Sequence, residues 1–203
     1  MRQGSRDFRC IQYDEPAFSF HPTEDTSLER TQEINRFLAS VEKRAYRMVH
    51  IATGNREDAL DILQDAMCKL VEKYADRDAT TWHPLFYTIL QSRIRDWYRR
   101  EKIRNRFRVW FGVHSADHEA SVDYVDKATP DPAVQLQRMQ QLQEVEKVIR
   151  SLPIRQQQAF MLRVFESCDV RQTAEIMGCS EGSVKTHHAR AMATMRDKLG
   201  ENT

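Results

Sequence analysis

The stretch DVRQTAEIMGCSEGSVKTHHARA, residues 169–191, carries the most specific pattern in the chain. It has the spacing of two helices joined by a tight turn, with a small residue at Ala174, a glycine at Gly178 and a β-branched residue at Val184. A small side chain lets two helices cross closely, and glycine readily takes the left-handed conformation that ends a helix. We therefore predict a helix-turn-helix in which Val184 anchors the second helix to the first.

The second helix of this pair has the chemistry of a helix that lies in a DNA major groove. Ser180 is the expected N-terminal cap, and the free amides of the next residues suit a DNA phosphate. The candidate DNA-contacting residues are Ser183, Lys185, Thr186, Ala189 and Arg190, with His187 expected on the same outer face. The roles of Lys185 and Arg190, base contact or phosphate contact, stay open. The alternative is an ordinary helical hairpin that carries solvated charge.

The composition is typical of a soluble, helix-rich protein of one large or two small domains. Of 203 residues, 30% are charged and 40% hydrophobic, and only six are Gly and six Pro. No apolar run approaches the about 20 residues of a membrane span, and the N-terminus lacks the apolar core of a secretory signal. We therefore expect a cytoplasmic protein without membrane insertion.

The sequence offers no convincing metal, cofactor or catalytic site. The cysteines form no CxxC pair and are expected to be reduced: they are Cys10, Cys68, Cys168 and Cys179. His187 and His188 lie near two of them, but metal sites usually show tighter ligand pairs, and the helix-turn-helix already accounts for this region. No His, Asp and Ser or Cys set recurs at a motif spacing. We expect a protein that is not an enzyme and binds no metal or cofactor.

Helical periodicity divides the rest of the chain into two groups. Three helices are expected over about residues 28–52, 56–74 and 84–102, and further helices over 133–150 and 155–165 lead into the helix-turn-helix. In the 56–74 helix, the side chains expected to face inward are Leu60, Leu63, Met67, Leu70 and Val71. The fold class is therefore all-α, with two small helical domains joined by a flexible acidic linker. The predicted segments are a flexible tail at 1–27, a helical domain at 28–104, the linker at 105–133 and the helix-turn-helix domain at 134–203.

The net charge of +1 conceals a basic block over residues 93–108 and an acidic block over residues 117–131, and a further group of acidic residues lies on the second helix. Asp61, Gln64 and Asp65 share one face of the second helix, at positions i, i+3 and i+4. A rigid acidic strip suits docking on a basic partner, although a solvated helix face is the plainer alternative.

In the third helix, basic and aromatic residues interleave, which is the chemistry for unpaired bases and their phosphates. Trp97 continues the apolar stripe and is expected to be mainly structural. The more exposed set is predicted to be Arg93, Tyr98, Arg99 and Arg100. The alternative is a basic end of an amphipathic helix.

Two motif sets, in this order, resemble those of extracytoplasmic-function (ECF) sigma factors, the compact promoter-recognition subunits of bacterial RNA polymerase. DILQDAM (residues 61–67) with LFYTILQSRIRDWYRR (residues 85–100) is similar to the domain that binds the polymerase clamp helices and the −10 promoter element. SLPIRQQQAF (residues 151–160) with the helix-turn-helix is similar to the domain that reads the −35 element.

The resemblance implies a protein that binds core RNA polymerase and promoter DNA and leaves the chemistry to the polymerase. It places Asp61, Gln64 and Asp65 at clamp-binding positions, and residues 76–82 at a loop that captures an unpaired promoter base. Family members often have an anti-sigma factor as a further partner. Leu85, Ser92, His188 and Ala189 depart from common family residues, so a relative's promoter sequence does not transfer. The alternative is a free-standing helix-turn-helix regulator that binds its operator without polymerase.

Overall fold

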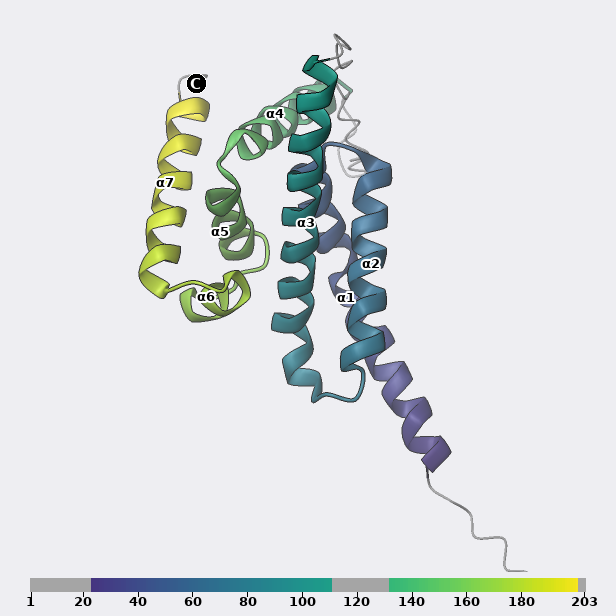
Figure 1. Ribbon diagram of the computed structural model, residues 1–203. Coiled ribbons are helices and arrows are strands. Elements are labelled where there is room, and N and C mark those ends of the chain that lie inside the picture. Colours follow the sequence, from purple (N-terminus) through teal and green to yellow (C-terminus); the bar gives the residue numbers. More distant parts are fainter. Residues whose placement is uncertain (1–22, 111–131, 201–203) are drawn as a thin grey trace, which may run out of the picture.

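The computed structural model describes residues 23–110 and 132–200, and within these ranges it contains seven helices and no strand (Figure 1). This confirms the predicted all-α class. The elements are α1 (Thr23–Thr53), α2 (Arg56–Tyr74), α3 (Ala79–Trp110), α4 (Pro132–Ser151), α5 (Ile154–Val164), α6 (Val170–Met177) and α7 (Glu181–Gly200). Most of the predicted tail and of the predicted acidic linker lies outside the described residues.

Helices α1, α2 and α3 pack as a three-helix bundle. Gly54, at φ +70°, ends α1, and the Asn55 side chain caps α2 by accepting hydrogen bonds from the amides of Glu57 at 2.8 Å and Asp58 at 3.1 Å. Because the cap starts α2 at Arg56, only two residues connect α1 to α2. The two helices therefore run side by side. Their shared core includes Val41, Ala45, Met48, Leu63, Ala66, Leu70, Phe86, Leu90 and Ile94.

Helix α3 is longer at both ends than the periodicity predicted. It begins at Ala79, because the Asp78 carboxylate accepts the amide of Thr80 at 2.8 Å and caps the helix upstream of Pro84. Trp82, which is buried, anchors this first turn through a hydrogen bond from its indole nitrogen to the Tyr74 carbonyl at 2.9 Å. These contacts outweigh the one backbone hydrogen bond that a proline removes from a helix interior.

The predicted helix-turn-helix is present in α6 and α7. Asp169 and Gln172 form a reciprocal capping box at the start of α6, and Gly178 ends it at φ +61°. Ala174 is buried where the two helices cross, and Val184 is completely buried beneath α7. The three residues that defined the sequence pattern therefore have the structural roles predicted for them.

The two halves of the chain pack against each other. Helix α6 contacts α3, helix α4 contacts α1, and the buried apolar side chains form one contiguous cluster. Helix α7 lies on the far side of α5 and α6 from α3 (Figure 1). The sequence predicted two domains but gave no indication of this contact.

Two glycines allow a matched test of backbone strain. An L-residue in the left-handed conformation costs about 1–2 kcal/mol, so both Gly54→Ala and Gly178→Ala should lower the free energy of unfolding. A Cβ at Gly54 would also lie 2.8 Å from the Arg150 guanidinium, whereas one at Gly178 meets nothing within 4 Å. Urea denaturation should therefore show the larger loss for Gly54→Ala. Equal losses would mean that the contact with Arg150 contributes nothing.

Candidate polymerase and nucleic-acid interfaces

The outer face of α2 combines acidic and apolar side chains. Asp61, Gln64 and Asp65 are all exposed, as expected for residues that share one helix face. Leu60 and Val71 were predicted to face inward, but they are 46% and 40% exposed. Leu63 and Leu70 are buried as predicted, and the bundle also buries Ala59, Ile62 and Ala66. Two exposed apolar side chains on an acidic helix were thus missed by the sequence analysis.

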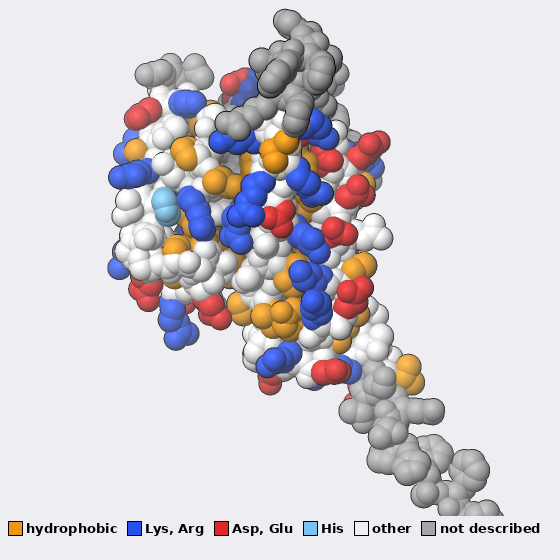
Figure 2. Space-filling view, in the orientation of Figure 1, with side chains coloured by type: hydrophobic (Ala, Val, Ile, Leu, Met, Phe, Trp, Pro, Cys, Tyr) orange, Lys and Arg blue, Asp and Glu red, His pale blue; other side chains and the backbone are white. Residues whose placement is uncertain are grey.

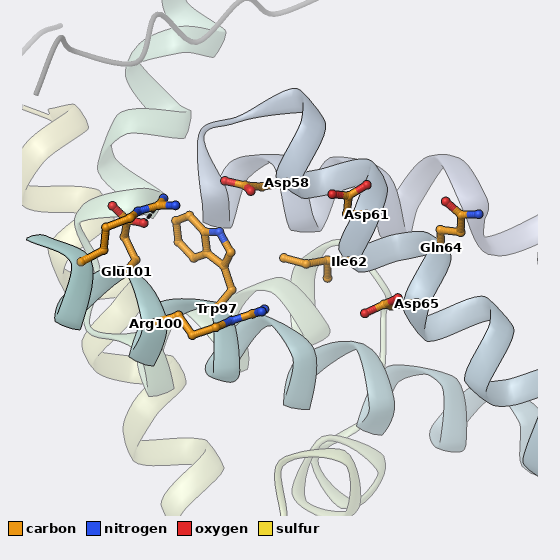
Figure 3. Close-up of a pocket in the computed structure, with 9 residues that line it drawn as sticks. Asp58, Asp61, Ile62, Gln64, Asp65, Trp97, Arg100 and Glu101 are labelled. Atoms are coloured by element: carbon orange, nitrogen blue, oxygen red, sulfur yellow. Dashed lines mark hydrogen bonds and ion pairs between the residues drawn. The ribbon is translucent and has the colours of Figure 1, made fainter.

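A cavity of about 380 Å³ lies between this acidic face and α3 (Figure 3). Its lining residues are Asp58, Asp61, Ile62, Gln64 and Asp65 from α2 and Trp97, Arg100, Glu101 and Arg104 from α3. The half-buried Trp97 ring stands opposite Asp58, and the Arg100 side chain extends along α3 toward Asp65 (Figure 3). Trp97 therefore packs on the core and also lines a surface hollow, where a mainly structural role was expected.

Opposite charges gather on adjacent helices of the N-terminal bundle. Figure 2 shows Lys and Arg in a band along α3 and the neighbouring C-terminal half, and Asp and Glu along the edge formed by α2. Arg99 and Arg100 are exposed in the basic band, as predicted. The Arg99–Asp96 ion pair, at 3.3 Å, is solvated and holds Arg99 only weakly. Both arginines therefore remain accessible to an anionic partner.

The structure corrects the predicted exposure of Tyr98 and Arg93. The Tyr98 hydroxyl donates to the Ala52 carbonyl at 2.9 Å and lies 3.3 Å from the Gln157 side-chain oxygen, and burial raises its pKa. Arg93 is half-buried, and its Nε is buried without a hydrogen-bond partner. Helical geometry correctly predicted that Tyr98 and Trp97 point in different directions. However, α1 and α5 cover the side of α3 on which Tyr98 lies.

The connection between α2 and α3 is shorter than predicted and is held by a residue that sequence analysis did not select. The Arg30 guanidinium donates to the carbonyls of Ala75, Asp76 and Arg77 at 2.5–3.0 Å. Its Cζ also lies 5.5 Å from the centroid of the Trp82 ring. A planar guanidinium suits such a set of acceptors. The loop that the resemblance links to base capture is thus fastened to α1.

Helix α7 presents most of the predicted DNA-contacting set to solvent. Lys185, Thr186, Ala189 and Arg190 are exposed, and Ser183 is half-buried beside the cap. The Ser180 hydroxyl accepts the Ser183 amide at 3.2 Å, and the Thr186 hydroxyl donates to the Gly182 carbonyl at 2.9 Å.

His187 differs from the expectation for the outer face of α7, because it is half-buried and its Nδ1 is buried without a partner. Burial lowers the pKa of His188, with a further contribution from Arg163. Neither histidine belongs to a metal cluster: the described ranges contain no group of three or more potential metal ligands. No helix in those ranges has the length and apolar character of a membrane span.

Two family profiles match the chain, one in each half. The profile of Sigma-70 region 2 matches residues 34–104, and that of Sigma-70 region 4 matches residues 142–195. RNA polymerase sigma factor SigV of Bacillus subtilis is 28% identical over 155 residues, which cover 76% of this chain and 83% of SigV. The ECF RNA polymerase sigma factor BldN of Streptomyces coelicolor is 23% identical, covering 77% of this chain and 56% of BldN.

A solved structure shares the fold of both halves. It is the sigma factor RpoE of Bartonella quintana in complex with the anti-sigma factor NepR, with a TM-score of 0.59 and 19% identity over 87% of this chain and 98% of that one. The profiles of regions 2 and 4 define a Sigma-70 type RNA polymerase sigma factor. Together with the similarity to named sigma factors, they place the chain in the ECF group of these factors. The free-standing regulator is not favoured.

Loss of the Arg30 contacts should make the α2–α3 loop open more readily. Arg30→Lys keeps the charge but loses the planar donor set, so amides in residues 75–81 should exchange with deuterium about tenfold faster. Arg36→Lys is the matched control, because the Arg36 guanidinium donates to the Gln32 carbonyl within its own helix. Unchanged protection in Arg30→Lys, measured by hydrogen-exchange mass spectrometry, would show that the loop does not depend on Arg30.

Substitutions on the exposed face of α7 test which of its side chains bind promoter DNA. Replacing Lys185, Thr186 and Arg190 by Ala should abolish transcription from a −35-dependent promoter, whereas Arg196→Ala, at the exposed far end of α7, should not. In single variants, loss of a base-reading arginine costs about 1–3 kcal/mol and relaxes preference at one position. Loss of a phosphate contact weakens all promoters alike. Normal transcription with the triple variant would leave only the solvated-charge alternative.

Proposed function

We propose that this sigma factor uses three separate surfaces of its two helical halves. The acidic and apolar face of α2 binds core polymerase. The exposed arginines of α3 and the α2–α3 loop contact the melted −10 region. The outer face of α7 reads the −35 element. The boundaries follow those predicted, with region 2 function at 28–104, region 4 function at 134–203 and the connection at 105–133.

The α2 face is the observation that carries the assignment to polymerase. Exposed apolar side chains next to carboxylates offer a partner apolar contact as well as charge. Leu60 and Val71 lie on either side of Asp61 and Asp65 along one rigid helix, so a fitting partner is basic at its centre and offers apolar contacts at its two ends. The clamp-binding role implied by the motif DILQDAM falls on this same face.

The proposed role is binding without catalysis, in the cytoplasm where the polymerase works. Sigma factors are transcription initiation factors, and the polymerase performs the bond-forming chemistry. The solved relative from Bartonella quintana is in complex with an anti-sigma factor, and we include such a partner for this chain. In this view, the exposed arginines of α3 and the acidic face of α2 serve different partners.

Charge reversal on α2 tests the polymerase interface. Asp61→Lys with Asp65→Lys would set like charges against a basic partner, and we expect core-polymerase affinity to fall about 100-fold or more. The control is Glu29→Lys with Glu42→Lys, which makes the same charge change at exposed positions of α1. Co-purification with core polymerase is the measurement, and circular dichroism monitors the fold. Retention of the α2 variant at the level of the control would overturn the assignment.

A further inference from the structure

We propose that Arg30 is a positioning residue for −10 recognition: it engages the carbonyls of the α2–α3 loop and so fixes the loop in the form in which the Asp76 and Arg77 side chains read an unpaired base. Arg30 itself does not touch the DNA. The proposal rests on the contact between this loop and the melted −10 region proposed above. It adds which side chains read the base and which residue holds them in place.

The Arg30 guanidinium joins three successive residues of the loop to α1. The loop lies at one end of the bundle, where α1 extends past it (Figure 1). The Arg30 Nε donates to the Ala75 carbonyl at 3.0 Å, and its Nη2 donates to the carbonyls of Asp76 at 3.0 Å and Arg77 at 2.5 Å. Carbonyls at the end of a helix lack intrahelical partners and carry partial negative charge, so a cation is favoured there. Because Arg30 lies 45 to 47 residues earlier in the chain, these contacts tie the loop to a separate rigid helix.

The guanidinium of Arg30 is itself held on its other sides. Its Cζ lies 5.5 Å from the centroid of the buried Trp82 ring, and its Nη1 lies 3.7 Å from a carboxylate oxygen of Glu33. Trp82 in turn donates from its indole nitrogen to the Tyr74 carbonyl, and its ring centroid lies 5.9 Å from that of Phe37. A guanidinium beside an aromatic ring keeps a fixed plane, so its donors keep a fixed direction toward the loop.

The backbone acceptors of the loop are engaged within the protein. The Tyr74 carbonyl accepts from the indole nitrogen named above and from the Arg77 amide, and the Asp78 carbonyl accepts from the amide and the hydroxyl of Thr81. Arg30 donates to the three carbonyls between them. The loop backbone is thus satisfied without DNA, and base recognition falls to the side chains.

Asp76 and Arg77 are the loop side chains with free polar groups. Both are exposed, and within residues 23–110 and 132–200 neither side chain forms a hydrogen bond or an ion pair. The Asp78 carboxylate, by contrast, accepts from the hydroxyl of Thr80 at 2.5 Å and from its amide at 2.8 Å. These hydrogen bonds lower the pKa of Asp78, with a smaller contribution from Arg30. Asp76 offers acceptors and Arg77 offers donors, which together suit a base edge that carries a donor beside an acceptor.

A loop fixed before binding favours one base over the others. A binding conformation that is formed in advance does not have to be ordered when the base arrives. Affinity falls in proportion to the fraction of molecules in the competent conformation. If loss of the Arg30 contacts lowers this fraction from near unity to about one-tenth, the preferred base binds about tenfold less tightly. A base that makes no contact with the loop is unaffected, so the loss is confined to one position of the promoter.

Holoenzyme assembled from the full-length chain and core polymerase provides the test. It is allowed to bind single-stranded DNA with a random segment, and sequencing of the bound molecules gives the base preference at each position. Arg30→Lys keeps the charge but loses the planar donor set, so preference at one −10 position should fall about tenfold while the other positions stay unchanged. Arg36→Lys, at an exposed position of the same helix, should keep the wild-type preference throughout. Asp76→Ala and Arg77→Ala should weaken preference at the position that Arg30→Lys affects.

The outcomes separate the role of Arg30 from that of the loop. Circular dichroism checks the helical content, and Arg30→Gln replaces Arg30→Lys if helicity is lost. Unchanged preference in the Arg30 variant, or an equal loss at every position, would overturn the positioning role, because a purely structural effect does not single out one base. If Asp76→Ala and Arg77→Ala weaken one position and the Arg30 variant does not, the loop keeps its proposed function and the inference about Arg30 fails. If neither loop variant alters any position, the proposed −10 function of the loop fails.

Discussion

Burial of one side of α3 is the constraint on which the rest of the structure depends. Phe86, Leu90 and Ile94 join this helix to the core of the N-terminal bundle, which fixes the direction of every other residue on it. At successive positions beyond them, Trp97 lines the cavity beside α2, whereas Tyr98 points to the C-terminal half. A single rigid helix of 32 residues therefore connects the α2–α3 loop, the acidic cavity and the contact between the halves.

Opposite charges lie close together on two adjacent helices. Carboxylates of α2 and arginines of α3 line the same cavity, where the Arg100 side chain extends toward Asp65 (Figure 3). Packing of the apolar faces of α2 and α3 determines which of these charged side chains line the cavity.

The contact between the two halves includes a side chain that the sequence predicted to contact DNA. Tyr98, whose aromatic ring suits stacking on an unpaired base, instead donates its hydroxyl to the Ala52 carbonyl of α1. Glu166 occupies a position where burial is unfavourable for a carboxylate, and Arg44 compensates for only part of that cost.

The sequence by itself determined the local features: the helix-turn-helix, from Ala174, Gly178 and Val184, and the shared face of Asp61 and Asp65. These follow from helical periodicity and glycine conformation, which act over a few residues. Only the tertiary structure decided the exposure of Leu60, Val71, Trp97 and Tyr98, the clamp that Arg30 makes on the α2–α3 loop, and the contact of Arg44 with Glu166. Periodicity shows which residues share a face, but a distant segment decides whether that face is covered, and this depends on how the helices pack in three dimensions.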